Sequence, residues 1–318
     1  SSCGCPTNFK LQNGECTPLT NTNETIVFRE KNPGEILISP TASYEWWSIN
    51  VEKFKEQFYQ NYGDFYDFIL LFPTKSLQAH YSITVNYDVK GLGVGYKPDS
   101  NLKQLKSITE LDFYTIWSAF SESTIRQELL RTIAHEMGHH WCCYIGGFGI
   151  NLPLHWTYNI DLFNGNPAYL DIMGYFQWIR KDSQEICVEN IPSITKRFSD
   201  LTLYLMGLLP KEQVRPIYVH DFEKKPGDSY FNTWGPSCDS SYKFLGTRTV
   251  TIDDIIKANG SRIPSYENSQ KDFRVAFVIL SEKNEDVPQG FIDYVKLYKQ
   301  ALPAAWEEAT DGKSHITY

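Results

Sequence analysis

Three of the seven histidines of the chain lie within six residues, in the stretch HEMGHH at 135–140, and Glu136 lies between the first two. The first five residues match the pattern H-E-x-x-H. On a helix, His135 and His139 leave the same face about 6 Å apart along the axis, so both imidazoles can bind one Zn²⁺ ion. Glu136 is not placed to join them as a ligand, but its carboxylate can take a proton from a metal-activated water. The spacing therefore predicts a catalytic zinc site with Glu136 as its general base.

A third protein ligand has to come from elsewhere, because catalytic zinc sites usually hold three protein ligands and one open position. The extended pattern H-E-x-x-H-x-x-G-x-x-H fails here, since Cys142 and Ile145 stand where its glycine and last histidine belong. We expect His155 to be the third ligand, because the glycine-rich turn at 146–149 gives the chain a short path back to the helix. The alternatives with a suitable donor nearby are Asp161, Asp171 and Cys142. The remaining histidines after the motif either point away around the helix or lack such a path: His140, His220 and His315.

The motif lies on the helix that the sequence predicts most strongly. An apolar residue recurs at every fourth position, which marks one buried stripe: Ile125, Leu129, Ile133, Met137 and Trp141. Ser121 or Ser123 is a suitable N-cap, and we expect the glycines at 146–147 to end the helix. His135 and His139 lie off the stripe, so the metal-binding face is expected to point away from the core on that side.

The other elements predict an α+β fold. Strand patterns occur at 68–72, 81–89, 108–117 and 273–281, and helical spacing occurs at about 50–62 and 289–308. The glycine-rich segment GLGVGY at 91–96 lacks the preceding strand and following helix of a dinucleotide-binding loop. We therefore expect a turn or an edge strand there, and an edge strand could pair with an extended substrate.

Composition restricts the classes of partner. The 318 residues are 42% hydrophobic and 21% charged, which is ordinary for a globular chain, and the length suffices for one large domain or two lobes. The net charge is −8 and no block of Lys or Arg is present, so nucleic acid is not an expected partner. No apolar run approaches the roughly 18 residues of a membrane span.

We expect an N-terminal Cys-rich stub at 1–20 and a catalytic domain at 21–318, with an upper lobe at about 45–145 and a lower lobe at about 146–318.

Cysteine usage favours an oxidising, extracellular setting. Three of the seven cysteines lie in the first 16 residues, in a pattern like that of small disulfide-stapled modules. The chain begins SSCGC without Met, so we expect a mature secreted product with disulfide bonds. For Cys142, a disulfide is the more expected state than metal ligation. The sequons at Asn23 and Asn259 permit a glycoprotein.

Further motifs carry a resemblance to a known group of enzymes. The segment DIMGY at 171–175 resembles the Met-turn of metzincins, and LYLMGL at 203–208 is the alternative. The order of HEMGHHW at 135–141, His155-Trp156 and YLMGLLP at 204–210 is similar to that in secreted, metzincin-like zincin metallopeptidases. The likeness covers about residues 65–313 and implies zinc and a zincin-like fold: a twisted mixed sheet, an active-site helix and a cleft between upper and lower lobes. It also implies Met173, or else Met206, as the floor of the site and Tyr175 as an oxyanion stabiliser.

Together these patterns predict a secreted zinc metalloendopeptidase, a hydrolase that acts on protein or peptide substrates. The alternative is a catalytically silent extracellular binding or structural protein on a metallopeptidase scaffold. The presence of Glu136 argues against it, because a site without catalysis has no need of a general base. A hydrolase that uses Cys142 or Cys143 with a histidine lacks any local signature and is set aside.

Overall fold

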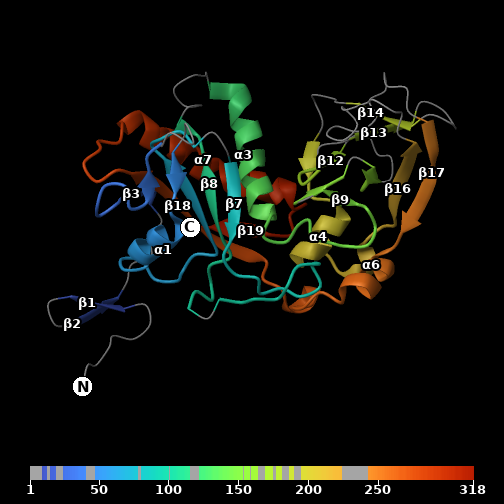
Figure 1. Ribbon diagram of the computed structural model, residues 1–318, viewed down its shortest axis with the longest axis horizontal. Helices are drawn as coiled ribbons and strands as arrows, with labels where there is room; N and C mark the ends of the chain where they lie inside the picture. The colour runs from blue at the N-terminus through green and yellow to red at the C-terminus, as the bar shows by residue number, and fades with distance from the viewer. Residues whose placement is uncertain are drawn as a thin grey trace.

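The computed structural model describes most of the chain, and every structural statement below concerns these parts alone. They are residues 9–12, 15–18, 24–40, 47–77, 80–99, 101–114, 122–152, 154–157, 159–163, 169–174, 177–180, 186–189, 195–223 and 243–318. Within them the fold is α+β, as the sequence predicts, with helices packed against a mixed β-sheet (Figure 1). None of the helices in these parts is long and apolar enough to cross a bilayer.

The main sheet has the strand order β19-β18-β6-β8-β7. Its long central strand β18 pairs in parallel with β6 on one side, while β19 and β3 share its other side. β8 continues the parallel arrangement, and β7 is antiparallel to β8 at the end of the described order. The strands are β3 (Ile26–Arg29), β6 (Phe68–Pro73), β7 (His80–Thr84), β8 (Ser107–Leu111), β18 (Asp272–Ser281) and β19 (His315–Thr317).

The unbroken apolar run of β6 results from helices on both faces of the sheet. Phe68, Leu70 and Phe72 belong to the core shared with α3 (Glu122–Gly138) and α7 (Gln289–Ala309). Ile69 and Leu71 belong to a second core shared with α1 (Val51–Phe58). A parallel strand buried on both faces needs apolar side chains at every position, which is why no alternation marks this strand in the sequence.

Helix α3 keeps the predicted stripe but ends earlier than expected. Leu129, Ile133, Met137 and Trp141 are all buried in the core. The helix ends at Gly138 rather than at the glycines of 146–147, and tighter turns follow, in which the His139 N–H donates to the Glu136 carbonyl at 3.3 Å. Glycine is the weakest ordinary helix former, so the helix ends where the sequence first offers one. The side chain of Ile125 and the whole of Ser121 lie outside the description, and Ser123 lies within the helix.

Smaller sheets and helices lie on the other side of α3 from the main sheet (Figure 1). They share the core of α3 and α7, since Met206 and Val219 pack in the same cluster as Phe68 and Trp306. The strands are paired as β9 (Asn151–Leu152) with β10 (His155–Trp156), β12 (Tyr169–Asp171) with β15 (Thr195–Arg197), β13 (Gln177–Arg180) with β14 (Ile186–Glu189), and β16 (Ile217–Glu223) between β11 (Ile160–Asp161) and β17 (Lys243–Val250). The helices are α4 (Asp200–Met206) and α6 (Ile252–Asn259).

Two short hairpins lie toward the N-terminus, β1 (Phe9–Gln12) with β2 (Glu15–Pro18) and β4 (Leu37–Ile38) with β5 (Ser48–Ile49). Single 3₁₀ turns occur at Lys211–Gln213 and Tyr266–Asn268. The first hairpin falls within the predicted stub at 1–20. The division of the remaining chain into two lobes stays a prediction.

The glycine-rich segment at 91–96 is a packing loop and not an edge strand. Gly91 and Gly93 both have a φ of 81°, which favours glycine. A Cβ on Gly93 would overlap the carbonyl of Tyr144, and one on Gly91 would lie 2.6 Å from that of Ser261. The glycines therefore let two other segments approach the loop closely. Of the two expectations for this segment, the turn agrees with the bends at 91–94, whereas the edge strand is wrong. The antiparallel strand at the edge of the described sheet is β7.

Candidate metal centre

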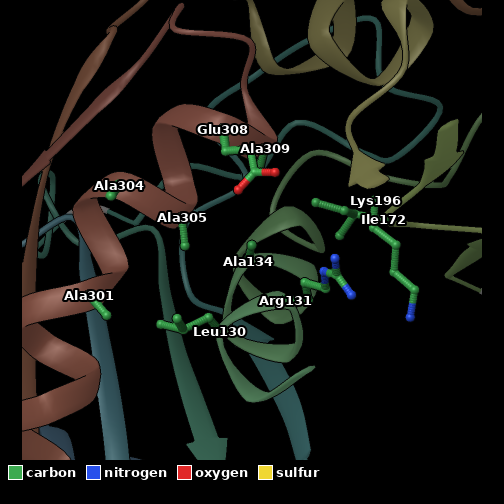
Figure 2. A pocket seen from close by; sticks show the side chains of 10 residues that line it. All are labelled: Leu130, Arg131, Ala134, Ile172, Lys196, Ala301, Ala304, Ala305, Glu308 and Ala309. Atoms are coloured by element: carbon green, nitrogen blue, oxygen red, sulfur yellow. The ribbon is translucent and has the colours of Figure 1, made fainter. Parts of the chain in front are cut away.

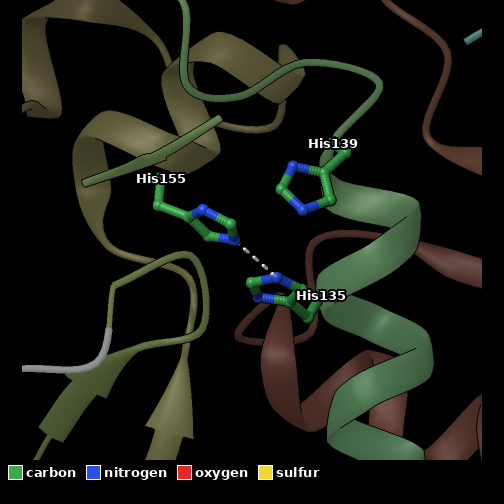
Figure 3. Close-up of side chains that lie close together, drawn as sticks. All are labelled: His135, His139 and His155. Carbon is green, nitrogen blue, oxygen red and sulfur yellow. Dashed lines mark hydrogen bonds between the residues drawn. The ribbon is translucent and has the colours of Figure 1, made fainter. Parts of the chain in front are cut away.

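The three predicted ligand histidines lie together at the C-terminal end of α3. His135 comes from its last turn, His139 follows its last residue, and His155 comes from β10. Their rings point toward one another (Figure 3), and one nitrogen from each lies within 4.8 Å of the other two. The Nε2 atoms of His135 and His155 are 3.1 Å apart. A tetrahedral zinc ion with bonds of about 2.0–2.1 Å holds its ligand atoms about 3.3 Å apart, which is close to the spacing of this pair. The three histidines could therefore hold a metal ion.

Burial keeps two of the three imidazoles, those of His135 and His139, neutral near neutral pH. It lowers the pKa of His135 to about 4 and that of His139 to about 3, and the neighbouring histidines lower both further. The Nδ1–H of His135 donates to the Ile172 carbonyl at 2.7 Å, which leaves its Nε2 lone pair directed at the cluster. A carbonyl that orients the ring in this way is the usual second partner of a metal-bound histidine. Neutral imidazole nitrogens are suitable ligands for zinc.

Glu136 lies between the cluster and the edge strand of the main sheet. Its Oε2 is 4.0 Å from Nε2 of His139. Burial raises the pKa of its carboxyl to about 7, and a hydrogen bond from the backbone of Ser82 in β7 partly lowers it. A carboxylate with such a pKa can exchange a proton near neutral pH. The predicted general base therefore lies beside the predicted ligands and next to an antiparallel strand.

Met173 packs directly beneath the motif. A Cβ on Gly138, the fourth residue of HEMGH, would lie 2.6 Å from Sδ of Met173 and 3.2 Å from the ring of Phe198. The glycine is therefore required for the close approach of Met173 to the helix. Met206, the alternative floor residue, lies in α4, and its carbonyl accepts a hydrogen bond from Arg262 at 3.1 Å. Tyr175, the predicted oxyanion stabiliser, lies outside the described residues.

The segment that carries His155 is held by neighbours on both sides. The loop before it is fixed by Asn259, whose side-chain oxygen accepts the Gly146 N–H at 3.1 Å. Leu154 sits in the hairpin turn with a φ of 68°, and its side chain is 46% exposed. After His155, the backbone N–H of Trp156 donates to the Met173 carbonyl at 3.1 Å. The histidine is thus anchored between a surface loop and the Met173 turn.

The alternative carboxylate ligands do not take part in the cluster. Asp171 uses both oxygens as acceptors of protein hydrogen bonds, from Met173, Ser199 and Thr202. In β11, Asp161 accepts the N–H of Phe163 at 3.0 Å. Their carboxylates are therefore engaged in local structure, and the metal-binding group found among the described residues consists of three histidines.

The alternative Cys and His side chains are also engaged elsewhere. Cys142 forms a disulfide with Cys143, and both side chains are buried. His140 faces Asp88, with Nε2 3.5 Å from Oδ1 of that residue. Nδ1 of His220 lies 2.9 Å from Thr247 Oγ1, and His315 pairs with Glu307 at 2.9 Å. Cys3, Cys5 and Cys238 lie outside the description, as do the side chains of Cys16 and Cys187.

Two residues support this centre in roles that the sequence did not predict. The hydroxyl of Tyr144 donates to the backbone carbonyl of His139 at 2.7 Å, and burial raises the pKa of that phenol to about 12. Asp171 is an alternative ligand in the sequence, whereas in the structure it braces the turn beneath the site. No periodic pattern marks Tyr144, but an Asp two residues before Met173 is a recognisable signal of a side-chain-capped turn.

A cavity of about 240 Å³ lies beside the motif helix (Figure 2). Two of its lining residues adjoin the metal centre: Ala134 precedes His135, and Ile172 provides the carbonyl that His135 contacts. Short side chains from α7 leave the space open, and charged groups occur at its edge. The lining consists of Leu130, Arg131, Ala134, Ile172, Lys196, Ala301, Ala304, Ala305, Glu308 and Ala309.

Comparison with known proteins gives no independent indication of function. No protein-family model matches the chain, and no curated protein and no solved structure matches it. The residues of the centre and their geometry are therefore the only basis for assigning a function.

Proposed function

We propose that the protein is a secreted, zinc-dependent endopeptidase that hydrolyses peptide bonds in protein or peptide substrates. The observation that carries this proposal is the convergence of His135, His139 and His155 beside Glu136. Three imidazoles and a separate carboxylate are the donor set of a catalytic zinc site with one open position. The parallel sheet with one antiparallel edge strand beside the motif helix supports a zincin-like fold.

Each side chain has a distinct role in the proposed reaction. His135, His139 and His155 would hold the zinc ion, which supplies Lewis acidity for the scissile carbonyl and lowers the pKa of a water molecule. Glu136 takes the proton of the attacking water and passes it to the leaving amine. The Ile172 carbonyl fixes the ring of His135 through Nδ1, and Met173 supports the helix beneath the two motif histidines.

Strand β7 offers a place for an extended substrate. It is the last strand in the described order of the main sheet, and Ser82 in its middle contacts Glu136. An extended peptide can add to such an edge through backbone hydrogen bonds, which do not depend on its side chains. A peptide bound there would pass the general base, as an endopeptidase requires.

Secretion is proposed from the cysteines. The disulfide between Cys142 and Cys143 is buried beside the motif and suits an oxidising compartment. Of the two sequons, Asn23 is the better candidate for a glycan. The side chain of Asn259 is half-buried and hydrogen-bonds both the N–H and the carbonyl of Gly146.

Metal analysis and hydrolysis of unfolded casein test the proposal. We expect about one zinc ion per chain in protein purified without chelator, and hydrolysis that chelator abolishes and zinc restores. Glu136→Gln should keep the zinc but lower turnover by a factor of about 100 or more, because only the base is lost. Zinc without hydrolysis by the wild type would favour the silent binding scaffold. Protein without zinc, or an active Glu136→Gln variant, would refute the mechanism.

A further inference from the structure

We propose that Asp171 is a positioning residue of the metal centre, which sets the geometry of two histidine ligands without binding the metal. Its carboxylate joins the Met173 turn to the start of α4 and, through Thr202, to the tryptophan beside His155. The inference rests on the proposed metal site and adds a residue to it.

The contacts of Asp171 use both carboxylate oxygens. Oδ1 accepts the backbone N–H of Met173 at 2.7 Å. Oδ2 accepts the backbone N–H of Ser199 at 2.7 Å and the hydroxyl of Thr202 at 2.9 Å. The side chain is 4% exposed, so water does not compete effectively for these donors. The carboxylate therefore links β12 to the first turn of α4.

The first ligand that this link positions is His135. Ile172 lies between Asp171 and Met173, and its carbonyl accepts the Nδ1–H of His135 at 2.7 Å. The Ile172 N–H in turn donates to the carbonyl of Arg197 at 3.1 Å. Because Asp171 fixes the turn that contains this carbonyl, it determines where the acceptor for His135 lies. The rotation of the His135 ring, and hence the direction of its Nε2 lone pair, depends on that acceptor.

The second ligand is His155, reached through its neighbour in the chain. The indole N–H of Trp156 donates to the hydroxyl of Thr202 at 3.0 Å, and the same hydroxyl donates to Asp171. The backbone N–H of Trp156 also donates to the Met173 carbonyl. Two hydrogen bonds thus dock β10 onto parts of the structure that Asp171 holds. Trp156 is 1% exposed, so its position is also fixed by packing.

A carboxylate is the side chain that this arrangement requires. All three partners of Asp171 act as donors, and they approach both oxygens. An asparagine has one acceptor oxygen, and its amide group would face at least one N–H or O–H donor. Asp171→Asn therefore keeps the volume of the side chain but breaks at least one link. The expected result is a folded protein with a misaligned metal centre.

The first experiment compares zinc affinity in the full chain by competition with a chromophoric chelator. Asp171→Asn should weaken zinc binding by at least about 10-fold, in line with the roughly 10–100-fold effect of residues that orient metal ligands. In the Co²⁺-substituted protein, the visible absorption bands should change shape, which a loss of stability alone would not produce. Asp161→Asn is the matched control, because that buried Asp also accepts an N–H two residues ahead but lies outside the cluster.

A second pair of variants tests the relay through Thr202. Thr202→Val keeps the shape but removes the hydroxyl that joins Trp156 to Asp171, whereas Thr202→Ser keeps the hydroxyl. We expect Thr202→Val to weaken zinc binding and Thr202→Ser to bind zinc almost as tightly as the wild type. This pair decides the question if Asp171→Asn does not fold.

The proposal is overturned if the wild type binds zinc and the folded Asp171→Asn or Thr202→Val protein binds it within about twofold, with an unchanged Co²⁺ spectrum. Equal weakening in Asp161→Asn, or no rescue by Thr202→Ser, would also overturn it. A wild type that binds no zinc instead refutes the proposed function, so the two failures are distinguishable.

Discussion

Each of the three clustered imidazoles has to keep a lone pair available for a metal, and the surrounding residues determine whether it does. Burial keeps His135 and His139 neutral, and the Ile172 carbonyl selects the tautomer of His135. His140 has the same ring, but it faces Asp88. His139 and His140 are neighbours in the chain but have different roles. The turn at the end of α3 directs His139 toward His155 in β10 and His140 toward Asp88.

The third ligand is tested by His155→Ala. We expect the variant to bind zinc at least about 10-fold more weakly, because one of three protein donors is lost, while the fold persists. Chelator competition measures the affinity, and circular dichroism checks the fold. His315→Ala is the control, since His315 is exposed and pairs with Glu307 away from the centre. Full zinc occupancy in His155→Ala would exclude it as a ligand.

A buried carboxyl remote from the motif predicts a pH-dependent stability. Burial raises the pKa of Glu110 to about 7, and a hydrogen bond from Tyr81 partly opposes this. The folded state therefore favours the protonated form, so stability is lost as pH rises from about 4.5 to 7. Glu110→Gln should raise the free energy of unfolding at pH 8 by about 2–3 kcal/mol and change it little at about pH 4. Urea unfolding at both pH values measures this.

The exposed Glu52 supplies the control for that comparison, because its side chain is 82% exposed and lies on the outer face of α1. Glu52→Gln should show no comparable gain at the higher pH. A Glu110→Gln protein with equal stability changes at both pH values would contradict the proposed ionisation.

At the level of elements, the close contact between α3 and the Met173 turn requires a residue without a side chain. Helix propensity alone would make Gly138→Ala stabilising by up to about 1 kcal/mol. The new Cβ would instead lie 2.6 Å from Met173 Sδ in a fully buried site, so we expect a net loss of about 1–2 kcal/mol and weaker zinc binding. Thermal unfolding and chelator competition measure both effects. Gly95→Ala is the control, because a Cβ on Gly95 would meet no atom within 4 Å. A more stable Gly138→Ala protein would show that the turn yields easily.

The type and place of many elements could be predicted from the sequence, because buried faces leave recognisable patterns of apolar residues. The stripe of α3 and the apolar run of β6 are examples. The sequence pattern places the end of α3 too late, because Trp141 continues the apolar spacing in the turns beyond the helix and hides Gly138 as a stop signal. The order of strands in the sheet could not be predicted, because it depends on pairing between segments far apart in the chain. The same holds for Asp171, whose partners Ser199 and Thr202 are brought to it by tertiary structure.

At the scale of the whole molecule, one apolar core of the described residues connects the main sheet, α3, α7 and the smaller sheets. Ala134 and Trp156 belong to this core and directly adjoin His135 and His155 in the chain. A metal bound to α3 and β10 would therefore stabilise the fold as a unit. Free zinc at about 1,000 times the dissociation constant contributes about 4 kcal/mol. We expect chelator to lower the melting temperature by several degrees and added zinc to restore it. The His155→Ala protein should lack most of this response, and an unchanged wild-type melting temperature would contradict the coupling.

The position of β18 in the chain has a consequence for folding during synthesis. Its neighbours β3 and β6 end at Arg29 and Pro73, whereas β18 begins only at Asp272. Until the ribosome has delivered β18, the edge of β6 that pairs with β18 has no partner strand. Contacts with such long sequence separation are slow to form, and unpaired apolar strands are prone to aggregation meanwhile. A nascent chain of this protein should therefore depend on chaperones until β18 emerges.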